Sequence, residues 1–331
     1  MTERIHRPRL AVPPETFPDE ARPAAGPIAL LPADGGERFE QAIRGGGGEV
    51  APLDGRTRGL VFLDYSRPQL LRDALDAHPN ISWVQLPYAG IDAMAELVAG
   101  HAERGVLFTS AKGAYAEPVA EHALTLALAA MRRMPLRLRA SEWGPKDGIS
   151  LYGANVVIVG AGGIALELLE LLRPFRCTTT IVRRSDEPVE GADATLPVDR
   201  LDEALPGADL VILAAAATSE TRALIDARRL AMLHERAVLV NIARGPLVDT
   251  EALADALERG AIYGAGLDVT DPEPLPYGHR MFSDDRCIIT PHTADTDEMT
   301  DPALALRIRQ NVEGFVSTGT FVGRCDPRIG Y

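Results

Sequence analysis

The sequence predicts an α/β protein with two parallel sheets, each covered by helices. Short apolar runs alternate with amphipathic segments along most of the chain, and this alternation occurs in two separate series. The 331 residues are enough for two domains with their own cores. Hydrophobic residues make up 46% and charged residues 24%, which is typical of a globular protein.

The first 27 residues differ from the rest of the chain. They hold six prolines and several charges without apolar periodicity, so we expect an extended or disordered arm over residues 1–27. The first alternating series begins after this arm. Its predicted strands are Ile28–Leu31, Leu60–Leu63, Trp83–Gln85 and Val106–Thr109, with Arg67–Ala77 among the predicted helices. The run Gly45–Gly48 is interpreted as a flexible turn, because no Lys-Ser or Lys-Thr follows it to make a phosphate loop.

The second series is the stronger one. It follows a helical segment, Glu117–Met134, whose apolar residues cover most of its circumference, as expected for a helix buried between two domains. Its predicted strands are Val156–Val159, Thr179–Val182, Leu210–Leu213, Val238–Asn241 and Ile288–Thr290. A last helix, about Pro302–Val316, is expected to pack back onto the first domain.

Charge and cysteine content narrow the function classes. The net charge of -13 disfavours nucleic acid and anionic membranes as partners, although a few arginines can still reverse the field locally. Three scattered cysteines form neither a disulfide framework nor a metal site. The most apolar stretch, Ala123–Met131, is too short to span a membrane, and no signal peptide is evident. We therefore expect a cytoplasmic protein without a metal.

A glycine turn follows the first strand of the second series, in Gly160-Ala161-Gly162-Gly163-Ile164-Ala165. Gly160 permits a tight turn, Gly162 lets the backbone approach a pyrophosphate, and Ala165 is small enough for close helix packing. The helix that starts near Gly163 directs its amino terminus at the negative charge. Such glycines alone can serve geometry only, but strand, turn, helix and next strand occur in the order of a dinucleotide site.

The next strand ends in Arg183-Arg184-Ser185, where an acidic residue would bind the ribose 2′-hydroxyl of NAD. Two guanidinium groups and a hydroxyl suit a 2′-phosphate, so we expect NADP(H), with NAD(H) as the alternative. The arginines can also be interpreted as a solvated loop beside Asp186 and Glu187.

Three charged residues, Arg244, Glu273 and His292, lie at the ends of strand-like segments, where a parallel sheet faces its ligand. Carbonyl reduction needs a group that holds the anionic substrate and an acid that protonates the alkoxide. Arginine offers a fork to a carboxylate, and histidine with a carboxylate partner donates a proton near neutral pH. Singly, each residue also fits an ordinary ion pair, loop or turn.

These motifs resemble those of the D-isomer-specific 2-hydroxyacid dehydrogenase family. The matching segments, in order, are Val119–His122, the glycine turn, Asn241–Leu247, Gly266–Pro274 and Thr290–Ala294, and the resemblance covers about Ile28 to Tyr331. It implies an oxidoreductase that transfers a hydride between NADP(H) or NAD(H) and C2 of a small 2-oxo or D-2-hydroxy acid. A substrate of the glyoxylate or hydroxypyruvate type is expected.

The resemblance also implies roles for individual residues. His292 is the general acid/base, Glu273 its partner and Arg244 the substrate-binding electrophile. Backbone N–H groups of Tyr88, Ala89 and Gly90 bind the substrate carboxylate, and Asp268 holds the nicotinamide carboxamide. The implied cofactor-binding residues are Gly160, Gly162, Gly163, Ile164, Arg183, Arg184, Ser185, Ala216, Thr221, Ile242 and Asp268.

The implied architecture is two Rossmann-like domains. A dinucleotide-binding domain, residues 112–293, is inserted into a substrate domain of residues 28–111 and 294–331, with a hinged cleft between them, and the protein is expected to be a homodimer. The sequence departs from the family pattern at Ala165, Arg183 and Ala216. Only Arg183 is expected to alter the chemistry, through cofactor choice.

Two alternatives remain. A 3-phosphoglycerate dehydrogenase is possible, although its frequent extra regulatory domain is missing, whereas the formate-oxidising relative is disfavoured because it has glutamine where this chain has Glu273. A nicotinamide-sensing binding protein like the C-terminal-binding-protein corepressors would retain the same three charged residues. The short segment after the last helix favours an enzyme over this sensor.

Overall fold

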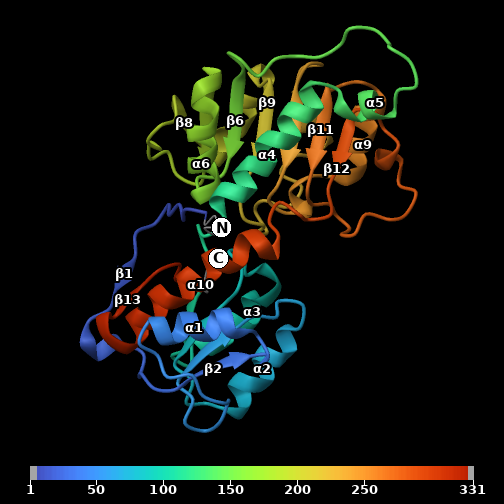
Figure 1. Ribbon diagram of the computed structural model, residues 1–331. Helices are drawn as coiled ribbons and strands as arrows, with labels where there is room; N and C mark the ends of the chain where they lie inside the picture. The colour runs from blue at the N-terminus through green and yellow to red at the C-terminus, as the bar shows by residue number, and fades with distance from the viewer. Residues whose placement is uncertain (1–5, 327–331) are drawn as a thin grey trace. The chain divides into compact units, whose positions relative to one another are not determined.

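The computed structural model describes residues 6–326, apart from the side chain of Ala93. The chain divides into two compact units (Figure 1). Unit 1 comprises Met1–Tyr115 and Asp297–Tyr331, and unit 2 comprises Ala116–Thr296. Each unit is built on a parallel sheet with helices, which confirms the predicted fold class.

Unit 1 contains a four-stranded parallel sheet in the order β2-β3-β4-β5. The strands are β2 (Ile28–Leu31), β3 (Gly59–Phe62), β4 (Trp83–Gln85) and β5 (Leu107–Thr109). The helices are α1 (Glu37–Gly45), α2 (Pro68–Ala77), η2 (Asp92–Met94), α3 (Ala95–Ala102), α10 (Asp297–Glu313) and the π-helical η8 (Gly314–Thr318). All four strands lie within a residue of their predicted places.

The amino-terminal arm of unit 1 contributes a short strand. Here β1 (Glu15–Thr16) pairs antiparallel with β13 (Thr320–Phe321), and η1 (Asp19–Ala21) follows it. Arg324 Nη1 contacts both carboxylate oxygens of Glu15, at 2.7 and 2.9 Å. The described part of the arm is thus attached to the end of the same unit, while residues 1–5 of the predicted arm lie outside the described residues.

Unit 2 contains a seven-stranded parallel sheet in the order β12-β11-β10-β9-β6-β7-β8. The strands are β6 (Asn155–Val159), β7 (Thr178–Arg183), β8 (Ala194–Pro197), β9 (Leu210–Leu213), β10 (Val238–Asn241), β11 (Gly264–Leu267) and β12 (Cys287–Ile289). The helices are α4 (Ala116–Met131), α5 (Met134–Arg139), α6 (Gly163–Leu172), α7 (Leu201–Ala204), α8 (Ala227–Leu230) and α9 (Thr250–Glu258). Short 3-10 helices are η3 (Arg173–Phe175), η4 (Val198–Arg200), η5 (Leu205–Gly207), η6 (Gly245–Leu247) and η7 (Arg280–Phe282). The strand order reverses at β6, which makes the ends of β6 and β9 the topological switch point of a doubly wound sheet.

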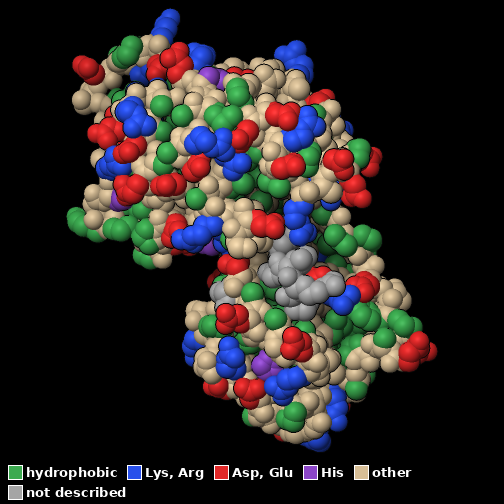
Figure 2. Space-filling view, turned by 180° about the vertical axis from the view of Figure 1, so that it is seen from behind, with side chains coloured by type: hydrophobic (Ala, Val, Ile, Leu, Met, Phe, Trp, Pro, Cys, Tyr) green, Lys and Arg blue, Asp and Glu red, His purple; other side chains and the backbone are tan. Residues whose placement is uncertain are grey.

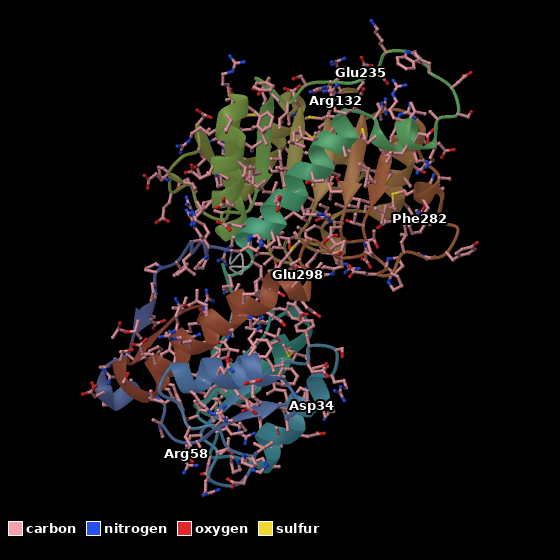
Figure 3. All side chains as sticks on the ribbon, viewed as in Figure 1. Asp34, Arg58, Arg132, Glu235, Phe282 and Glu298 are labelled. Carbon is pink, nitrogen blue, oxygen red and sulfur yellow. The ribbon has the colours of Figure 1, made fainter. Side chains whose placement is uncertain are left out.

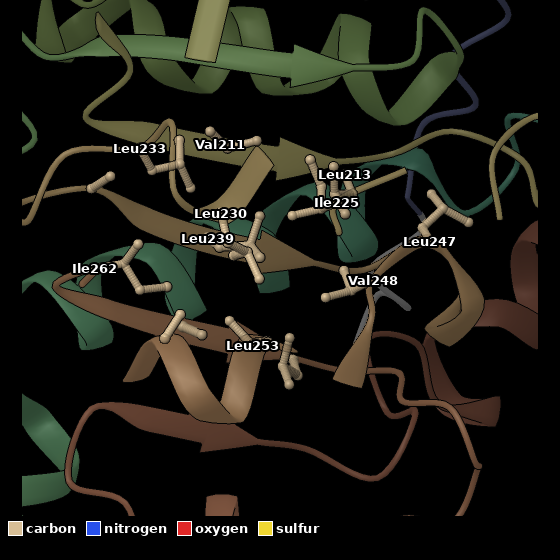
Figure 4. Packing of buried hydrophobic residues seen from close by; sticks show 14 of the residues in the cluster. Val211, Leu213, Ile225, Leu230, Leu233, Leu239, Leu247, Val248, Leu253 and Ile262 are labelled. Carbon is tan, nitrogen blue, oxygen red and sulfur yellow. The ribbon is translucent and has the colours of Figure 1, made fainter. Parts of the chain in front are cut away.

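Packing on the two faces of the unit 2 sheet follows the alternation of its strands. The side chains of Val211, Leu213 and Leu239 pack with Leu230 of α8 and Leu253 of α9 (Figure 4). Residues of the other parity face α4, which packs against α6, β10 and β11. Burial on both faces explains why these strands are continuous apolar runs.

Strand β11, Gly-Ala-Gly-Leu, was not predicted because glycine weakens a strand. A Cβ at Gly266 would lie 2.7 Å from Cβ of Leu126 in α4, so the helix passes too close for any side chain there. The close packing of α4 therefore requires glycine at position 266. Because glycine has a low strand propensity, the sequence does not indicate a strand there. Strand β8, with partly exposed residues, was missed for lack of an apolar run.

The predicted helix Glu117–Met134 corresponds to α4, which ends at Met131, three residues before the predicted end. Arg133 takes a left-handed conformation with φ 54°, which ends α4 before α5 begins. Its Nη1 donates to Tyr263 O at 2.7 Å, and its guanidinium lies 3.9 Å from the centroid of the Tyr263 ring. Contacts with a residue far along the sequence thus stabilise the break.

The last helix, α10, begins at Asp297 and includes Pro302, so it starts earlier than predicted. It packs against α1 within unit 1. The glycine turn after α1 allows this contact, because a Cβ at Gly48 would lie 2.7 Å from Ile28 Cδ1 and 2.8 Å from Val312 Cγ1. The turn that was interpreted as flexible is therefore a close-packed one.

The surface carries both charges. Figure 2 shows acidic and basic side chains interspersed on the face in view, without one broad patch of a single sign. Within residues 6–326, no helix has both the length and the apolar character needed to cross a lipid bilayer. The same residues contain no group of three or more His, Cys, Asp or Glu placed to hold a metal ion.

Candidate active site

The predicted catalytic residues of unit 2 follow the carboxyl ends of neighbouring strands. Arg244 follows β10, Glu273 follows β11 and His292 follows β12. These strands are adjacent and parallel, so their ends lie along one edge of the sheet. The structure therefore brings the three segments to the same region of unit 2.

His292 and Glu273 form a direct pair. His292 Nδ1 lies 2.6 Å from Glu273 Oε1, and the two side chains are 46% and 42% exposed. His292 has a left-handed backbone conformation, φ 50°, which is costly for a residue with a side chain. Its N–H donates to Asp268 O at 2.9 Å, which helps to hold it there. Because Nδ1 is occupied by the carboxylate, Nε2 is the atom left to exchange a proton with a ligand.

Arg244 lies in a tightly built loop. Asn241 Nδ2 donates to Arg244 O at 2.9 Å, and Arg244 Nη1 donates to Ala243 O at 2.8 Å. The next residue, Gly245, approaches the backbone of Thr270 so closely that a Cβ would overlap its carbonyl group. Only glycine fits there, and this contact joins the loop of Arg244 to the loop that leads to Glu273.

Asp268 anchors the loop that carries His292. It is 2% exposed and accepts hydrogen bonds from Thr290 Oγ1 at 2.6 Å and from the N–H groups of Thr293 and Ala294 at 2.9 and 3.0 Å. Burial raises the pKa of Asp268, but the hydrogen bonds from His122, Thr290 and the two backbone groups outweigh it, so the pKa lies below its ordinary value. The carboxylate therefore stays ionised and fixes the loop.

His122 of α4 completes this network. Its Nε2 lies 2.9 Å from Thr290 Oγ1 and 3.4 Å from Asp268 Oδ1. Since the Thr290 hydroxyl donates to Asp268, it accepts from Nε2–H of His122. In the sequence, His122 is recognisable only as the last residue of the Val119–His122 motif, which indicates no role for it. Its contact with Thr290 spans 168 residues, so no local signal indicates it.

Asp295 was also missed. Burial raises its pKa, Asp268 raises it further, and the positive charges of His292 and Arg244 oppose the rise. These influences place Asp295 among the charged groups of the site. Its sequence neighbourhood, directly after the His292 motif, was the available signal.

The glycine turn has the geometry that a dinucleotide needs. Gly160 has φ 118°, and a Cβ there would lie 2.5 Å from Ala214 O, in the segment after β9. Gly162 is the N-cap of α6, and beyond the neighbouring residues none of the described residues has an atom within 4 Å of an added Cβ, so the described chain leaves the space before the helix open to a ligand. Gly163 and Ile164 form the first turn of α6, whose backbone N–H groups suit a phosphate.

The segment after β7 is where an adenosine ribose would lie in this fold. Arg183 pairs loosely with Glu187, with Nη2 3.8 Å from Oε2. Ser185 Oγ is buried and has no hydrogen-bond partner within the described residues. A hydroxyl without a partner and two neighbouring guanidinium groups can all donate hydrogen bonds to a phosphate. These three residues are therefore compatible with the 2′-phosphate on the ribose of NADP.

The other expected cofactor residues follow β9 and β10. Thr221 Oγ1 donates to Ala216 O at 2.9 Å and accepts from the N–H of Thr218 at 2.8 Å, which closes the turn after β9. Ile242 directly follows β10 and is 6% exposed. Both segments lie at the same sheet edge as the glycine turn.

The candidate substrate loop, Tyr88 to Gly90, belongs to unit 1 and follows β4. The ring of Tyr88 makes edge contacts with Tyr65 and Tyr115, with centroids 5.2 and 6.4 Å apart. Within residues 6–326, neither the Ala89 N–H nor the Gly90 N–H donates a hydrogen bond. A carboxylate is the kind of ligand that such paired backbone donors bind.

Comparison with known families identifies the family to which this chain belongs. A model of the D-isomer specific 2-hydroxyacid dehydrogenase family, for its NAD binding domain, matches residues 123–294, which is more than half of the chain. The chain belongs to this family. Family membership makes the protein an oxidoreductase with a nicotinamide cofactor, as the sequence predicts.

Curated relatives match most of this chain. An uncharacterized protein in the proB 3′ region of Corynebacterium melassecola is 36% identical over 296 residues, which covers 88% of this chain and 95% of that protein. A glyoxylate reductase from Pyrococcus furiosus is 34% identical over 224 residues, covering 64% of this chain and 66% of that protein.

Solved structures agree with this family membership. A D-isomer specific 2-hydroxyacid dehydrogenase from Xanthobacter autotrophicus Py2, in complex with NADPH and MES, is 26% identical with a TM-score of 0.78 and covers 93% of this chain and 100% of its own. An NADPH-dependent glyoxylate/hydroxypyruvate reductase from Sinorhizobium meliloti, in complex with NADP and malonate, is 25% identical with a TM-score of 0.73 and covers 93% of this chain and 98% of its own.

Proposed function

We propose that this dehydrogenase reduces a small 2-oxo acid of the glyoxylate or hydroxypyruvate type to its D-2-hydroxy acid, with NADPH as the preferred reductant. The observation that carries the proposal is the His292–Glu273 pair, with Nδ1 and Oε1 2.6 Å apart, beside the loop of Arg244. A paired histidine and an arginine supply the acid and the carboxylate-binding cation that the reduction needs.

In the proposed mechanism, the nicotinamide supplies a hydride to C2 when the cofactor is bound. His292 donates a proton from Nε2 to the oxygen on C2, and Glu273 orients the ring and stabilises its protonated form. Arg244 holds the substrate carboxylate and polarises the carbonyl group. The backbone N–H groups of Tyr88, Ala89 and Gly90 in unit 1 bind the same carboxylate.

The domain roles follow from these assignments. Residues 112–293 form the dinucleotide-binding domain, and residues 28–111 with 294–331 form the substrate domain. Within the described residues Asp268 Oδ2 accepts one hydrogen bond, from Ala294, so the oxygen keeps the capacity to accept a second one, from an amide N–H of the nicotinamide carboxamide. The Gly160, Gly162, Gly163 and Ile164 turn binds the pyrophosphate, while Ala216, Thr221 and Ile242 line the cofactor.

The preference for NADP(H) rests on the last residue of β7 and the two residues that follow it. Arg183, Arg184 and Ser185 stand where an acidic residue would select the 2′-hydroxyl of NAD, and Ser185 Oγ has no partner within the described residues. The structures of the dehydrogenases from Xanthobacter and Sinorhizobium hold NADPH and NADP, respectively. Replacing Arg183 with Asp should lower kcat/KM for NADPH about 10- to 100-fold relative to NADH.

A substrate panel tests the proposed function. Purified protein is assayed for oxidation of NADPH and NADH with glyoxylate, hydroxypyruvate, pyruvate, 2-oxoisovalerate and 3-phosphohydroxypyruvate. We expect turnover with the two smallest 2-oxo acids, and about 10²- to 10⁴-fold less with His292→Asn at unchanged NADPH affinity. Near-normal turnover in that variant contradicts the role of His292, and tight NADPH binding without any turnover favours a nicotinamide sensor.

We also propose that the protein is a homodimer. Unit 2 exposes large apolar side chains on α5 and the loop after it, with Leu138 78% and Trp143 96% exposed, and Phe282 of η7 is 48% exposed (Figure 3). Apolar side chains exposed to this degree are typical of a protein interface. Light scattering should give twice the mass of the 35.5 kDa chain, and Trp143→Ser should shift the mass toward the monomer.

A further inference from the structure

Two carbonyl groups at the start of the candidate substrate loop, those of Pro87 and Tyr88, accept hydrogen bonds from the segment after β5. Tyr115 Oη donates to Pro87 O at 2.6 Å, and the Ala111 N–H donates to Tyr88 O at 3.1 Å. These peptide bonds are trans, so each N–H points away from the carbonyl of its own peptide group. Hydrogen bonds behind the loop therefore direct the Tyr88 and Ala89 N–H groups forward.

Arg307 binds the peptide group whose N–H holds the Tyr88 carbonyl. This side chain of α10 is 1% exposed, and its Nη1 donates to Ser110 O at 2.8 Å. The Ser110 carbonyl and the Ala111 N–H belong to one peptide group. A continuous series thus leads from the guanidinium of Arg307 through Ser110–Ala111 and Tyr88–Ala89 to the Ala89 N–H.

Every hydrogen bond in this series points the same way. Hydrogen bonds in series polarise one another, and the low dielectric of the interior strengthens the effect. A positive charge at the back of the series therefore increases the attraction of the Ala89 N–H for an anion in front of it. The Ala89 N–H donates no hydrogen bond within residues 6–326, so this donor is available to a ligand.

The burial of Arg307 is energetically unfavourable, which indicates a functional role for its charge. Burial lowers the pKa of Arg307 to about 10, so the guanidinium remains charged at neutral pH. Its Nε has no hydrogen-bond partner among the described residues. Placing a charged group in such surroundings is costly, and a neutral donor would satisfy the Ser110 carbonyl at a lower cost.

We propose that Arg307 and Tyr115 are positioning residues for the substrate carboxylate, which hold the loop from behind and, through Arg307, strengthen its N–H groups as anion donors. The inference rests on the proposed function of the loop at Tyr88 to Gly90. It differs from a merely structural tie between α10 and β5, which would stabilise the fold without favouring an anion.

Two substitutions of Arg307 separate these roles. Arg307→Met removes the charge but keeps an unbranched apolar side chain, whereas Arg307→Lys keeps the charge. The measurements are KM and kcat for the 2-oxo acid, KM for NADPH, and the calorimetric dissociation constant of oxamate, an unreactive anionic analogue, with the NADPH complex. We expect Arg307→Met to raise the KM for the 2-oxo acid and the dissociation constant of oxamate about tenfold or more. The change in kcat should be smaller, and the KM for NADPH should not change.

Arg307→Lys should keep the same constants within about threefold of the unmodified protein. An Arg307→Met variant that melts within a few degrees of the unmodified protein, yet binds oxamate equally well, overturns the proposal. If Arg307→Met does not fold, Tyr115→Phe decides, because it removes only the hydroxyl behind Pro87. We expect this variant to weaken oxamate binding about three- to tenfold.

Tyr152→Phe is the matched control for Tyr115→Phe. Tyr152 belongs to unit 2, is 58% exposed and contacts the ring of Phe175. Loss of its hydroxyl should therefore change neither the KM for the 2-oxo acid nor the dissociation constant of oxamate. Equal oxamate constants in the Tyr115→Phe and Tyr152→Phe variants contradict the positioning role. Failure of the proposed function looks different, since the unmodified protein would then turn over no 2-oxo acid.

Discussion

Alanine substitutions at Gly162 and Gly160 should separate cofactor binding from folding. Gly162 has φ -80°, which any residue adopts, and within residues 6–326 no atom beyond the neighbouring residues lies within 4 Å of an added Cβ. Gly162→Ala should therefore change the free energy of unfolding by less than about 0.5 kcal/mol. The same methyl group occupies the open space before α6, where a pyrophosphate would approach the backbone. We expect the dissociation constant of NADPH to rise about 10- to 100-fold, or about 1.4 to 2.8 kcal/mol.

Gly160→Ala should act on folding instead. Gly160 has φ 118°, and an added Cβ would lie 2.5 Å from Ala214 O, whereas ordinary contact begins at 3.4 Å. Both the unfavourable backbone conformation and the contact with a carbonyl group raise the free energy of the folded state. A loss of about 2 to 4 kcal/mol in the free energy of unfolding is expected.

Urea unfolding and a fluorescence titration with NADPH, applied to both variants, measure these effects. Gly207→Ala is the control, since Gly207 also belongs to unit 2 and an added Cβ there would meet no atom of the described chain within 4 Å beyond the neighbouring residues. This control should retain both stability and affinity. Gly162→Ala with unchanged NADPH affinity would refute the assignment of the open space to the cofactor, and Gly160→Ala with unchanged stability would refute the packing argument.

Three further predictions concern the sheet-edge site and the core. Glu273→Gln should lower turnover about 10- to 100-fold, because an amide stabilises a protonated imidazole less than a carboxylate does. Equal turnover of the variant and the unmodified protein across the pH range would contradict the pairing with His292. Asp268→Asn should cost about 2 to 4 kcal/mol in urea unfolding at pH 7. Since the pKa of Asp268 is lowered in the folded state, this stability is present above its unfolded pKa and is lost as pH falls through the folded value, so the two proteins should converge below about pH 4. Burial raises the pKa of Cys287 to about 12 and that of Cys325 to about 11, so a thiol reagent at pH 8 should modify neither until urea unfolds the protein.

The sequence by itself determined the elements whose signals are local. Strands β9 and β10 occur at the predicted bounds, because a strand buried on both faces is a continuous apolar run. The turn at Gly160 and the start of α6 at Gly163 were predictable for a similar reason, since strand, turn and helix follow one another directly. The family motifs added the expectation that Arg244, Glu273 and His292 act together.

Only the tertiary structure decided the features that depend on residues far apart in the sequence. The break between α4 and α5 depends on the contact of Arg133 with Tyr263, and β11 is a strand because α4 approaches Gly266. The same holds for the contact of His122 with Thr290 and for the hydrogen bond from Arg307 to Ser110 O. Propensity and periodicity describe the surroundings of a residue along the chain, whereas these contacts arise from packing of segments more than a hundred residues apart, so no local pattern could indicate them.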